Sequence, residues 1–232
     1  SPLRPTTAAP TLADTDLFLG VIDRHILSPT TLFTVRVGVL AHDTTVTPAS
    51  TSSPELTPLG WNGASFSTLD RRSSRLTASA AWQHSVATTA GTHSMTVETT
   101  FDDERLQGAV ANQTLKIRDA TGGLVRQIEF GGTGVLAASA RHLGIAVRDN
   151  WRVSDALQFD GGIRVDRNSL GAGLTPSARL GARYQFGDGS TSVSGTVGRF
   201  VGTLPLTVPA FAGFPTRRDL TIDPASGTAV GS

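Results

Sequence analysis

The sequence has no cysteine, a single methionine, a single tyrosine and a single lysine, Lys116. The missing cysteine excludes a disulfide scaffold, a thiol nucleophile and a metal held by thiolates. No run of apolar residues approaches the length of about 18 that a transmembrane helix needs. Charged residues make up only 17% of the chain and the net charge is +1. A general nucleic-acid binder is therefore not expected, because it needs a concentrated basic surface.

Glycine, with 25 of the 232 residues, and threonine are abundant, and both disfavour helices. Alternation of apolar and polar residues with period two recurs instead, as in strands that have two different faces. In the clearest stretch, Phe159 and Ile163 fall on one face while Asp160 and Arg164 fall on the other. The pattern predicts eight strands, at residues 17–27, 31–41, 74–86, 93–104, 141–153, 157–166, 177–186 and 191–200.

The connections between these strands alternate strictly between short and long. The long ones are 42–72, 105–140, the shorter 167–176 and the tail 201–232. An up-and-down antiparallel sheet has this pattern when one rim has tight turns and the other has elaborated loops, as in outer-membrane barrels, whose strands of about 10 residues cross an apolar band. Inside the second long connection, 112–118 and 123–130 predict a small hairpin that projects beyond the rim.

Each predicted face suggests a role. Trp82 and Trp151 lie near short turns, where an interfacial aromatic girdle is expected. The polar face is expected to line a lumen with Arg36, Glu98, Asp160, Arg164, Asp166, Arg179 and Arg183. Arginine–carboxylate pairs across neighbouring strands would hold the wall together, and direct participation in solute passage is the alternative.

Antiparallel sheets of soluble proteins also alternate, with one face on a core and the other in water. The strand length, the alternating loop length and the many Gly and Ala residues on the apolar face favour the barrel. Small residues fill a soluble core poorly, but they are tolerated where lipid supplies the contact.

The stretch DNWRVSDALQFDGGIRVD, from Asp149 to Asp166, resembles a strand–turn–strand unit of TonB-dependent outer-membrane receptors of the Oar-like type. Asp149, Asn150 and Trp151 match the end of a descending strand in that family. Residues 162–166 match its Gly-x-Arg-Tyr-Asp pattern, with Val165 in place of tyrosine. SARLGARYQF (177–186) and GTVGRF (195–200) resemble the following hairpin, and 215–227 resembles the start of a long extracellular loop. The specific resemblance begins at about residue 141.

The resemblance implies import of a scarce or bulky solute across the outer membrane, powered by the TonB complex, with solute contacts mostly in the extracellular loops. Neither a plug domain nor a TonB box is visible, and the chain begins Ser1-Pro2-Leu3 without a signal peptide. If the short turns are periplasmic, both ends of the chain lie outside the cell. We therefore expect residues 1–232 to be a partial barrel domain within a larger barrel, in contact with outer-membrane lipid, the unknown solute and, through a missing N-terminal region, the TonB complex.

No catalytic, cofactor or metal site is expected, and hence no enzyme. The five histidines lack metal-ligand spacing; they are His25, His42, His84, His93 and His142. The acids 102–104 predict a solvated rim that could gather a cation. Gly131–Gly134 lacks the lysine of a phosphate loop, and no serine lies in a nucleophile elbow. Two alternatives remain open: a non-transporting adhesion or surface-architecture barrel, and a soluble secreted β-sandwich that binds carbohydrate.

Overall fold

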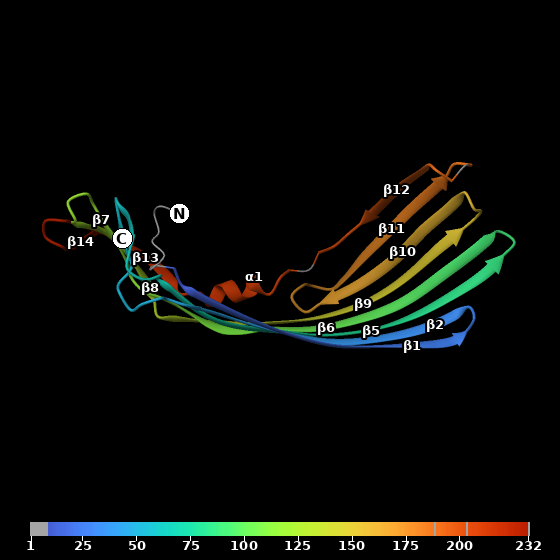
Figure 1. The fold of residues 1–232 in the computed structure, drawn as a ribbon, viewed down its shortest axis with the longest axis horizontal. Coiled ribbons are helices and arrows are strands. Elements are labelled where there is room, and N and C mark those ends of the chain that lie inside the picture. Colours follow the sequence, from blue (N-terminus) through green and yellow to red (C-terminus); the bar gives the residue numbers. More distant parts are fainter. Residues whose placement is uncertain (1–8, 188, 203, 232) are drawn as a thin grey trace.

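The computed structural model describes residues 9–187, 189–202 and 204–231, and strands make up most of them (Figure 1). Residues 1–8, which include the Ser1-Pro2-Leu3 start discussed above, lie outside the described residues. The elements are β1 (Thr11–Ser28), β2 (Thr31–Thr47), β3 (Glu55–Thr57), β4 (Gly60–Asn62), β5 (Ser67–Thr88), β6 (Gly91–Asn112), β7 (Leu115–Arg118), β8 (Leu124–Gly131), β9 (Thr133–Arg152), β10 (Leu157–Asn168), β11 (Leu174–Gln185), β12 (Ser192–Arg199), α1 (Thr207–Ala210), η2 (Phe211–Gly213), β13 (Thr216–Ile222) and β14 (Ala229–Gly231).

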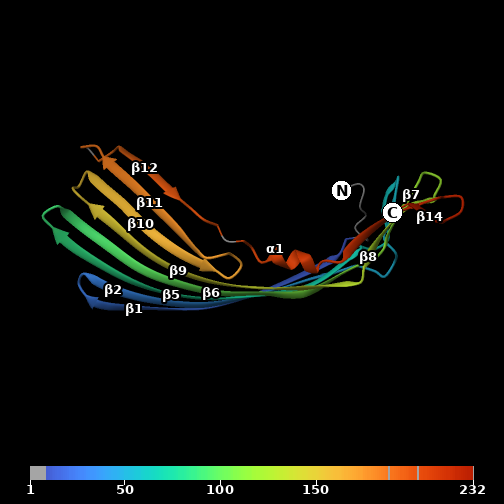
Figure 2. The same cartoon turned by 180° about the vertical axis from the view of Figure 1, so that it is seen from behind.

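The main sheet has eight strands in the order β1-β2-β5-β6-β9-β10-β11-β12, and every neighbouring pair is antiparallel. This confirms the predicted up-and-down antiparallel arrangement. Within the described residues the sheet does not close on itself, so β1 and β12 form its two edges. Figures 1 and 2 show a long, curved wall with a concave and a convex side and with all the short turns at one end.

The strands run farther from the short turns than the sequence pattern predicted. β5 and β6 have 22 residues each and β9 has 20. The predicted loop boundaries 42–72 and 105–140 were therefore wrong, because β2, β5, β6 and β9 occupy much of both ranges. The range 201–232 likewise contains α1, η2, β13 and β14.

The alternation pattern did not predict the strand extensions, because the apolar and the polar face exchange sides along them. Leu106, Val110 and Leu136 lie on the concave side of the extensions and are almost completely buried. They form one cluster with Leu206 and Ala210 of the α1 segment. Figure 1 shows α1 lying against the concave side. Each strand thus continues to alternate, but its apolar residues move from the convex face to the concave one.

The short α1–η2 segment approaches the backbone of β9 closely. A Cβ atom on Gly213 would lie 1.9 Å from the carbonyl oxygen of Val135, so only glycine allows this approach. Among the residues that the structure describes, no helix is long and apolar enough to cross a membrane.

The long connections form a second, six-stranded sheet at the end opposite the short turns, in the order β14-β13-β8-β7-β3-β4. The predicted hairpin is present as β7 and β8. Its turn is fixed by Asp119, whose Oδ1 accepts hydrogen bonds from the backbone N–H groups of Thr121 and Gly123 at 2.9 and 2.8 Å. Gly122 has φ of +86°, a conformation that favours glycine.

Candidate functional site

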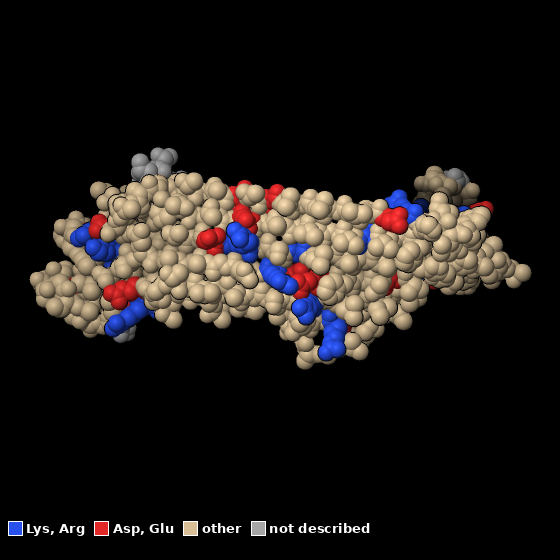
Figure 3. Space-filling model, turned by 90° about the horizontal axis from the view of Figure 1, so that it is seen from below, with Lys and Arg blue, Asp and Glu red and all other residues tan. Residues whose placement is uncertain are grey.

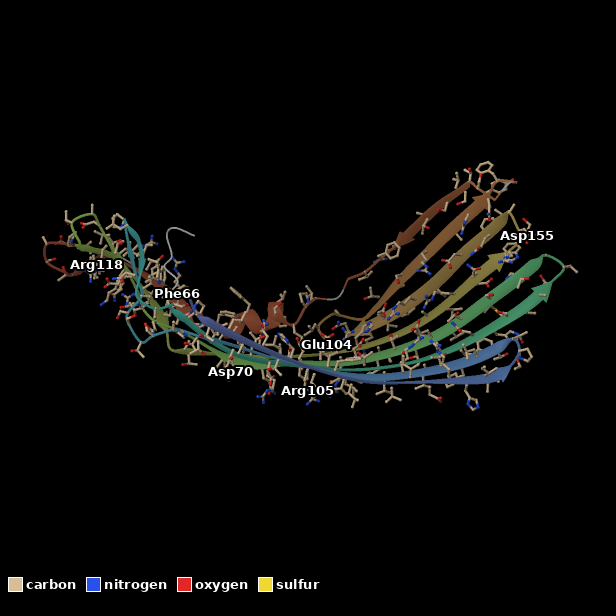
Figure 4. The ribbon with its side chains drawn as sticks, viewed as in Figure 1. Phe66, Asp70, Glu104, Arg105, Arg118 and Asp155 are labelled. Atoms are coloured by element: carbon tan, nitrogen blue, oxygen red, sulfur yellow. The ribbon has the colours of Figure 1, made fainter. Side chains whose placement is uncertain are left out.

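The register of the main sheet brings the predicted polar residues to one face. Residues paired directly in antiparallel strands point to the same side of the sheet. Figure 4 shows Glu104 on the concave side of β6 and Arg105 on the convex side. Counting along the register from Glu104 assigns all seven predicted lumen-facing residues to the concave face: Arg36, Glu98, Asp160, Arg164, Asp166, Arg179 and Arg183.

Aromatic side chains gather on the convex face near the short turns. We call Trp82, Trp151, Phe159 and Tyr184 the aromatic belt; all four share this face. The Trp151 ring stacks on His93 at 5.3 Å between centroids and lies 5.7 Å from Phe159. Its indole N–H donates a hydrogen bond to the carbonyl oxygen of Ala90 in a short turn, at 3.0 Å. This geometry is that of an amphipathic ring at a boundary between apolar and polar surroundings.

Beyond the aromatic belt, the convex face is mostly apolar and uncovered, although the register also places Asp23 and Asp149 on it. Ile163 is 62% exposed and Ile145 is 54% exposed, although both lie in the middle of their strands. The six-stranded sheet lies at the far end of the wall and does not pack on this face (Figures 1 and 2). A soluble sandwich would need a second sheet there to bury these side chains.

The apolar surface ends at a line of arginines, which we call the arginine row: Arg72, Arg105, Arg141 and Arg167, from β5, β6, β9 and β10. Figure 3 shows charged side chains gathered across the middle of the convex face. From each strand to the next, the arginine moves two residues toward the short turns. Arg105 lies opposite Ser74, two residues past Arg72, and Arg141 lies opposite Asp103, two residues past Arg105.

The aromatic belt follows the same slope as the arginine row. Trp82 is ten residues from Arg72 along β5, and Trp151 is ten residues from Arg141 along β9. Ten residues of strand rise roughly 33 Å. At a strand tilt of about 40° this length gives a height of about 25 Å, which matches the apolar band of an outer-membrane barrel. On β5 and β9 the convex face therefore carries an apolar band of the same height, whereas on β10 the belt residue Phe159 is eight residues from Arg167.

The concave face carries a hydrogen-bonded cluster across β5, β6, β9 and β10, which we call the central polar network: Arg75, Thr77, Thr100, Asp102, His142, Arg164 and Asp166. Asp102 is buried and accepts hydrogen bonds from Arg75 at 2.9 Å and from Thr77 at 2.7 Å. Each ring nitrogen of His142 faces a carboxylate: Nδ1 lies 3.3 Å from Asp102 and Nε2 lies 2.8 Å from Asp166.

Arg164 completes the network on β10. Its Nε donates to both oxygens of Asp166, at 2.7 and 2.9 Å, and its Nη2 donates to Thr100 at 2.9 Å. A hollow beside the network is lined by Arg75, Asp102, His142 and Arg164, and also by Leu204, which lies between β12 and α1. The arrangement places paired charges and hydroxyl groups, with no large apolar side chain except Leu204, next to an open space.

The other predicted residues form separate pairs or none. Glu98 accepts a hydrogen bond from Arg148, and Asp160 lies 3.2 Å from the Arg179 guanidinium group. In the described part of the chain, neither Arg36 nor Arg183 makes a side-chain hydrogen bond or ion pair.

Sequence reasoning missed the centre of the network. The acids 102–104 were expected to form a solvated rim, but the pleat separates them: Asp102 and Glu104 face the concave side and Asp103 faces the convex side. His142 was expected to be a scattered surface residue. Strand alternation, continued from Glu98 to Asp102, would have indicated the concave orientation of this acid.

The six-stranded sheet has its own ion pair. The two carboxylate oxygens of Glu55 on β3 accept hydrogen bonds from Arg118 on β7, at 3.1 and 2.9 Å. These hydrogen bonds hold the pKa of Glu55 below its usual value and raise the pKa of Arg118. Hydrogen bonds from Arg217 and Arg126 similarly lower the pKa of Asp219 on β13. Paired charges thus join strands that come from different long connections.

Comparison with known proteins gives little direct guidance. No protein-family description matches the sequence, and no curated protein matches it. Among solved structures, the outer membrane transporter YddB from Escherichia coli is similar, with 13% sequence identity and a TM-score of 0.43. The likeness covers 88% of this chain and 31% of that chain, so the chain spans about a third of the length of that transporter. A likeness at this level does not transfer the activity of the transporter to this chain.

Proposed function

We propose that the eight-stranded sheet is part of the wall of an outer-membrane β-barrel, with its convex face in lipid and its concave face toward a polar lumen. One observation carries the proposal: on β5 and β9 the apolar band of the convex face has the same height, between a tryptophan of the aromatic belt and an arginine of the arginine row. A soluble protein has no reason to keep two such boundaries parallel across strands. A bilayer imposes them, because its apolar layer has a fixed thickness.

The edges of the sheet fit a segment of a larger barrel. β1 and β12 have no partner strand on one side within the described residues. Lipid offers no hydrogen-bond donors or acceptors, so a spanning wall needs further strands at both edges. In this proposal the six-stranded sheet and α1 lie on the extracellular side, where the sheet projects beyond the wall and α1 packs on its concave side.

The role proposed for the whole protein is uptake of a scarce or bulky solute, as the resemblance to TonB-dependent receptors implies. The polar concave face between α1 and the short turns, and the hollow beside the central polar network, support a lumen through which a polar solute can pass. Coupling to the TonB complex would depend on a plug domain and a TonB box in the full-length protein. The proposal gives this wall no part in making or breaking bonds.

Fractionation of cells that express the full-length protein tests the membrane assignment. The protein is expected in the outer-membrane fraction, resistant to extraction by alkaline carbonate and folded only in detergent or lipid. A full-length protein that stays folded and monomeric in buffer without detergent would overturn the assignment. A full-length sequence that lacks a plug domain and a TonB box would keep the barrel and replace transport by a surface-architecture role.

A further inference from the structure

The convex face has a positively charged hollow at the outer edge of the apolar band, and the wall proposed above does not require it. The hollow is lined by side chains that include Arg105, Arg141, Ser139, Ser169 and Gln107. It lies over β6 and β9 and the residues that follow β10, next to Arg167. Two of the four members of the arginine row thus line the hollow together with Asp103, and Arg167 lies two residues before the lining residue Ser169.

The charges in this part of the row do not balance. Arg105 and Arg141 share one carboxylate, Asp103: its Oδ2 lies 3.0 Å from Nε of Arg105 and its Oδ1 lies 3.0 Å from Nε of Arg141. Arg167 is exposed, and within the described residues its side chain makes no hydrogen bond or ion pair. Three guanidinium groups thus face a single carboxylate. Arg72 differs, because Asp43 pairs with it at 3.1 Å and Asp70 is exposed two residues away on the same face.

The three cations are also accessible. The side chains of Arg105 and Arg141 are 59% and 72% exposed. Ser169 is held beside Arg141, since the backbone N–H of Arg141 donates to the Ser169 hydroxyl at 2.9 Å and the backbone N–H of Ser169 donates to the Arg141 carbonyl at the same distance. These two hydrogen bonds hold the Ser169 hydroxyl group beside Arg141.

We propose that Arg105, Arg141 and Arg167 bind the phosphate groups of anionic lipid headgroups in the outer leaflet; the inference rests on the proposed membrane-spanning wall. In that wall the arginine row lies at the level where the apolar layer ends and headgroups begin. Guanidinium groups bind phosphate oxygens with two parallel hydrogen bonds, and the hydroxyl and amide groups of the hollow supply further donors. A bound lipid phosphate would neutralise the excess charge and fix the height of the wall in the membrane.

Lipid binding by the full-length protein in detergent tests the inference. The probe is diphosphoryl lipid A, with its dephosphorylated form as the comparison, and binding is measured by native mass spectrometry. The triple variant Arg105→Gln/Arg141→Gln/Arg167→Gln is expected to bind diphosphoryl lipid A on the order of a hundredfold more weakly, since each guanidinium near an anionic surface contributes roughly a factor of five. The matched control Arg126→Gln/Arg217→Gln/Arg218→Gln removes the same charge from the six-stranded sheet and should bind as the unmodified protein does.

Three results would overturn the inference: equal binding by the triple variant, equal binding of the dephosphorylated lipid, or complete displacement of the lipid by millimolar inorganic phosphate, which would indicate a site for the free ion. Insertion into phosphatidylcholine vesicles is measured in parallel. If the unmodified protein does not insert, the proposed wall fails; if it inserts and the triple variant keeps its lipid affinity, only the lipid site fails.

Discussion

Trp151 and Arg141 lie on the same convex face of β9, ten residues apart, with only one charged side chain, Asp149, between them on that face. The carboxylate of Asp149 is close to the aromatic end and contacts His93 at 2.7 Å. Trp82 and Arg72 repeat this separation on β5. The same separation of tryptophan and arginine thus occurs on two strands, β5 and β9, which are neighbours of β6 on its two sides. Such a repeat is expected where both strands cross an apolar layer of one thickness.

The depth of the tryptophans in a bilayer can be measured directly. In full-length variants that keep a single tryptophan, quenching by lipids brominated at different depths should give the same depth for Trp82 and Trp151, near the headgroups. Trp61, in β4 of the six-stranded sheet, should not be quenched. Different depths for Trp82 and Trp151 would contradict the parallel boundaries.

The face assignment predicts a large difference between two arginine substitutions on β10. Ile163→Arg places a charge in the apolar band and should lower the free energy of unfolding in vesicles by about 2–4 kcal/mol. Asp160→Arg changes the concave face, where water can reach the new charge and only the ion pair with Arg179 is lost. Urea titrations of the protein in vesicles would measure both. Equal losses would show that the faces are assigned wrongly.

The central polar network predicts an unequal cost for two conservative substitutions. Asp102→Asn removes a buried carboxylate that accepts hydrogen bonds from Arg75 at 2.9 Å and from Thr77 at 2.7 Å, and should destabilise the wall by about 2 kcal/mol. Arg75 itself is half exposed and keeps Glu104 at 3.4 Å. Asp160→Asn removes an ion pair whose partners are both 40% exposed and should cost less than about 1 kcal/mol. The same urea titrations compare them, and a larger effect at Asp160 would refute the central importance of Asp102.

The Glu55–Arg118 pair predicts an acid-sensitive six-stranded sheet. Because folding lowers the pKa of Glu55 below its usual value of 4.5, the pair stabilises the fold above that pH, and the contribution is lost as the pH falls through the lower, folded pKa. The protection factors for hydrogen exchange in β3 and β7, which compare the observed rate with the chemical rate at the same pH, should therefore fall in acid. Glu55→Gln should remove this fall in these strands but leave that of β13, where Asp219 has its own lowered pKa. Unchanged acid sensitivity of β3 in the variant would exclude the pair as its cause.

The buried contact of α1 with β9 predicts that weakening it makes the α1 segment more sensitive to proteases. Leu136→Ala removes a side chain that is 3% exposed from the cluster that holds Leu206 and Ala210, at a cost of about 2–5 kcal/mol. The segment 204–214 should then be cut faster by proteases, with the convex face unaffected. Val135→Ala, on the other face of β9 and 68% exposed, is the control and should leave the rate unchanged.

The strands of the apolar band could be predicted because each residue there has one of two environments. Phe159, Ile163 and Trp151 on one parity and Asp160 and Arg164 on the other specify both the strand and its faces. Alternation alone does not assign the faces of the first strand. β1 carries apolar residues on both parities, including Phe18 and Leu19, and only its pairing with β2 assigns Leu19 to the convex face.

The sequence by itself determined the strand order, the short turns, the hairpin around Asp119 and the polar parity of the seven concave residues, since all of these depend on neighbours along the chain or on alternation within one strand. Only the tertiary structure decided where the strands end, because their polarity reverses when α1 covers the concave side. It also decided that Asp102, His142 and Asp166 meet, and that four arginines from four strands form one row. These contacts depend on register between strands, which local alternation does not encode.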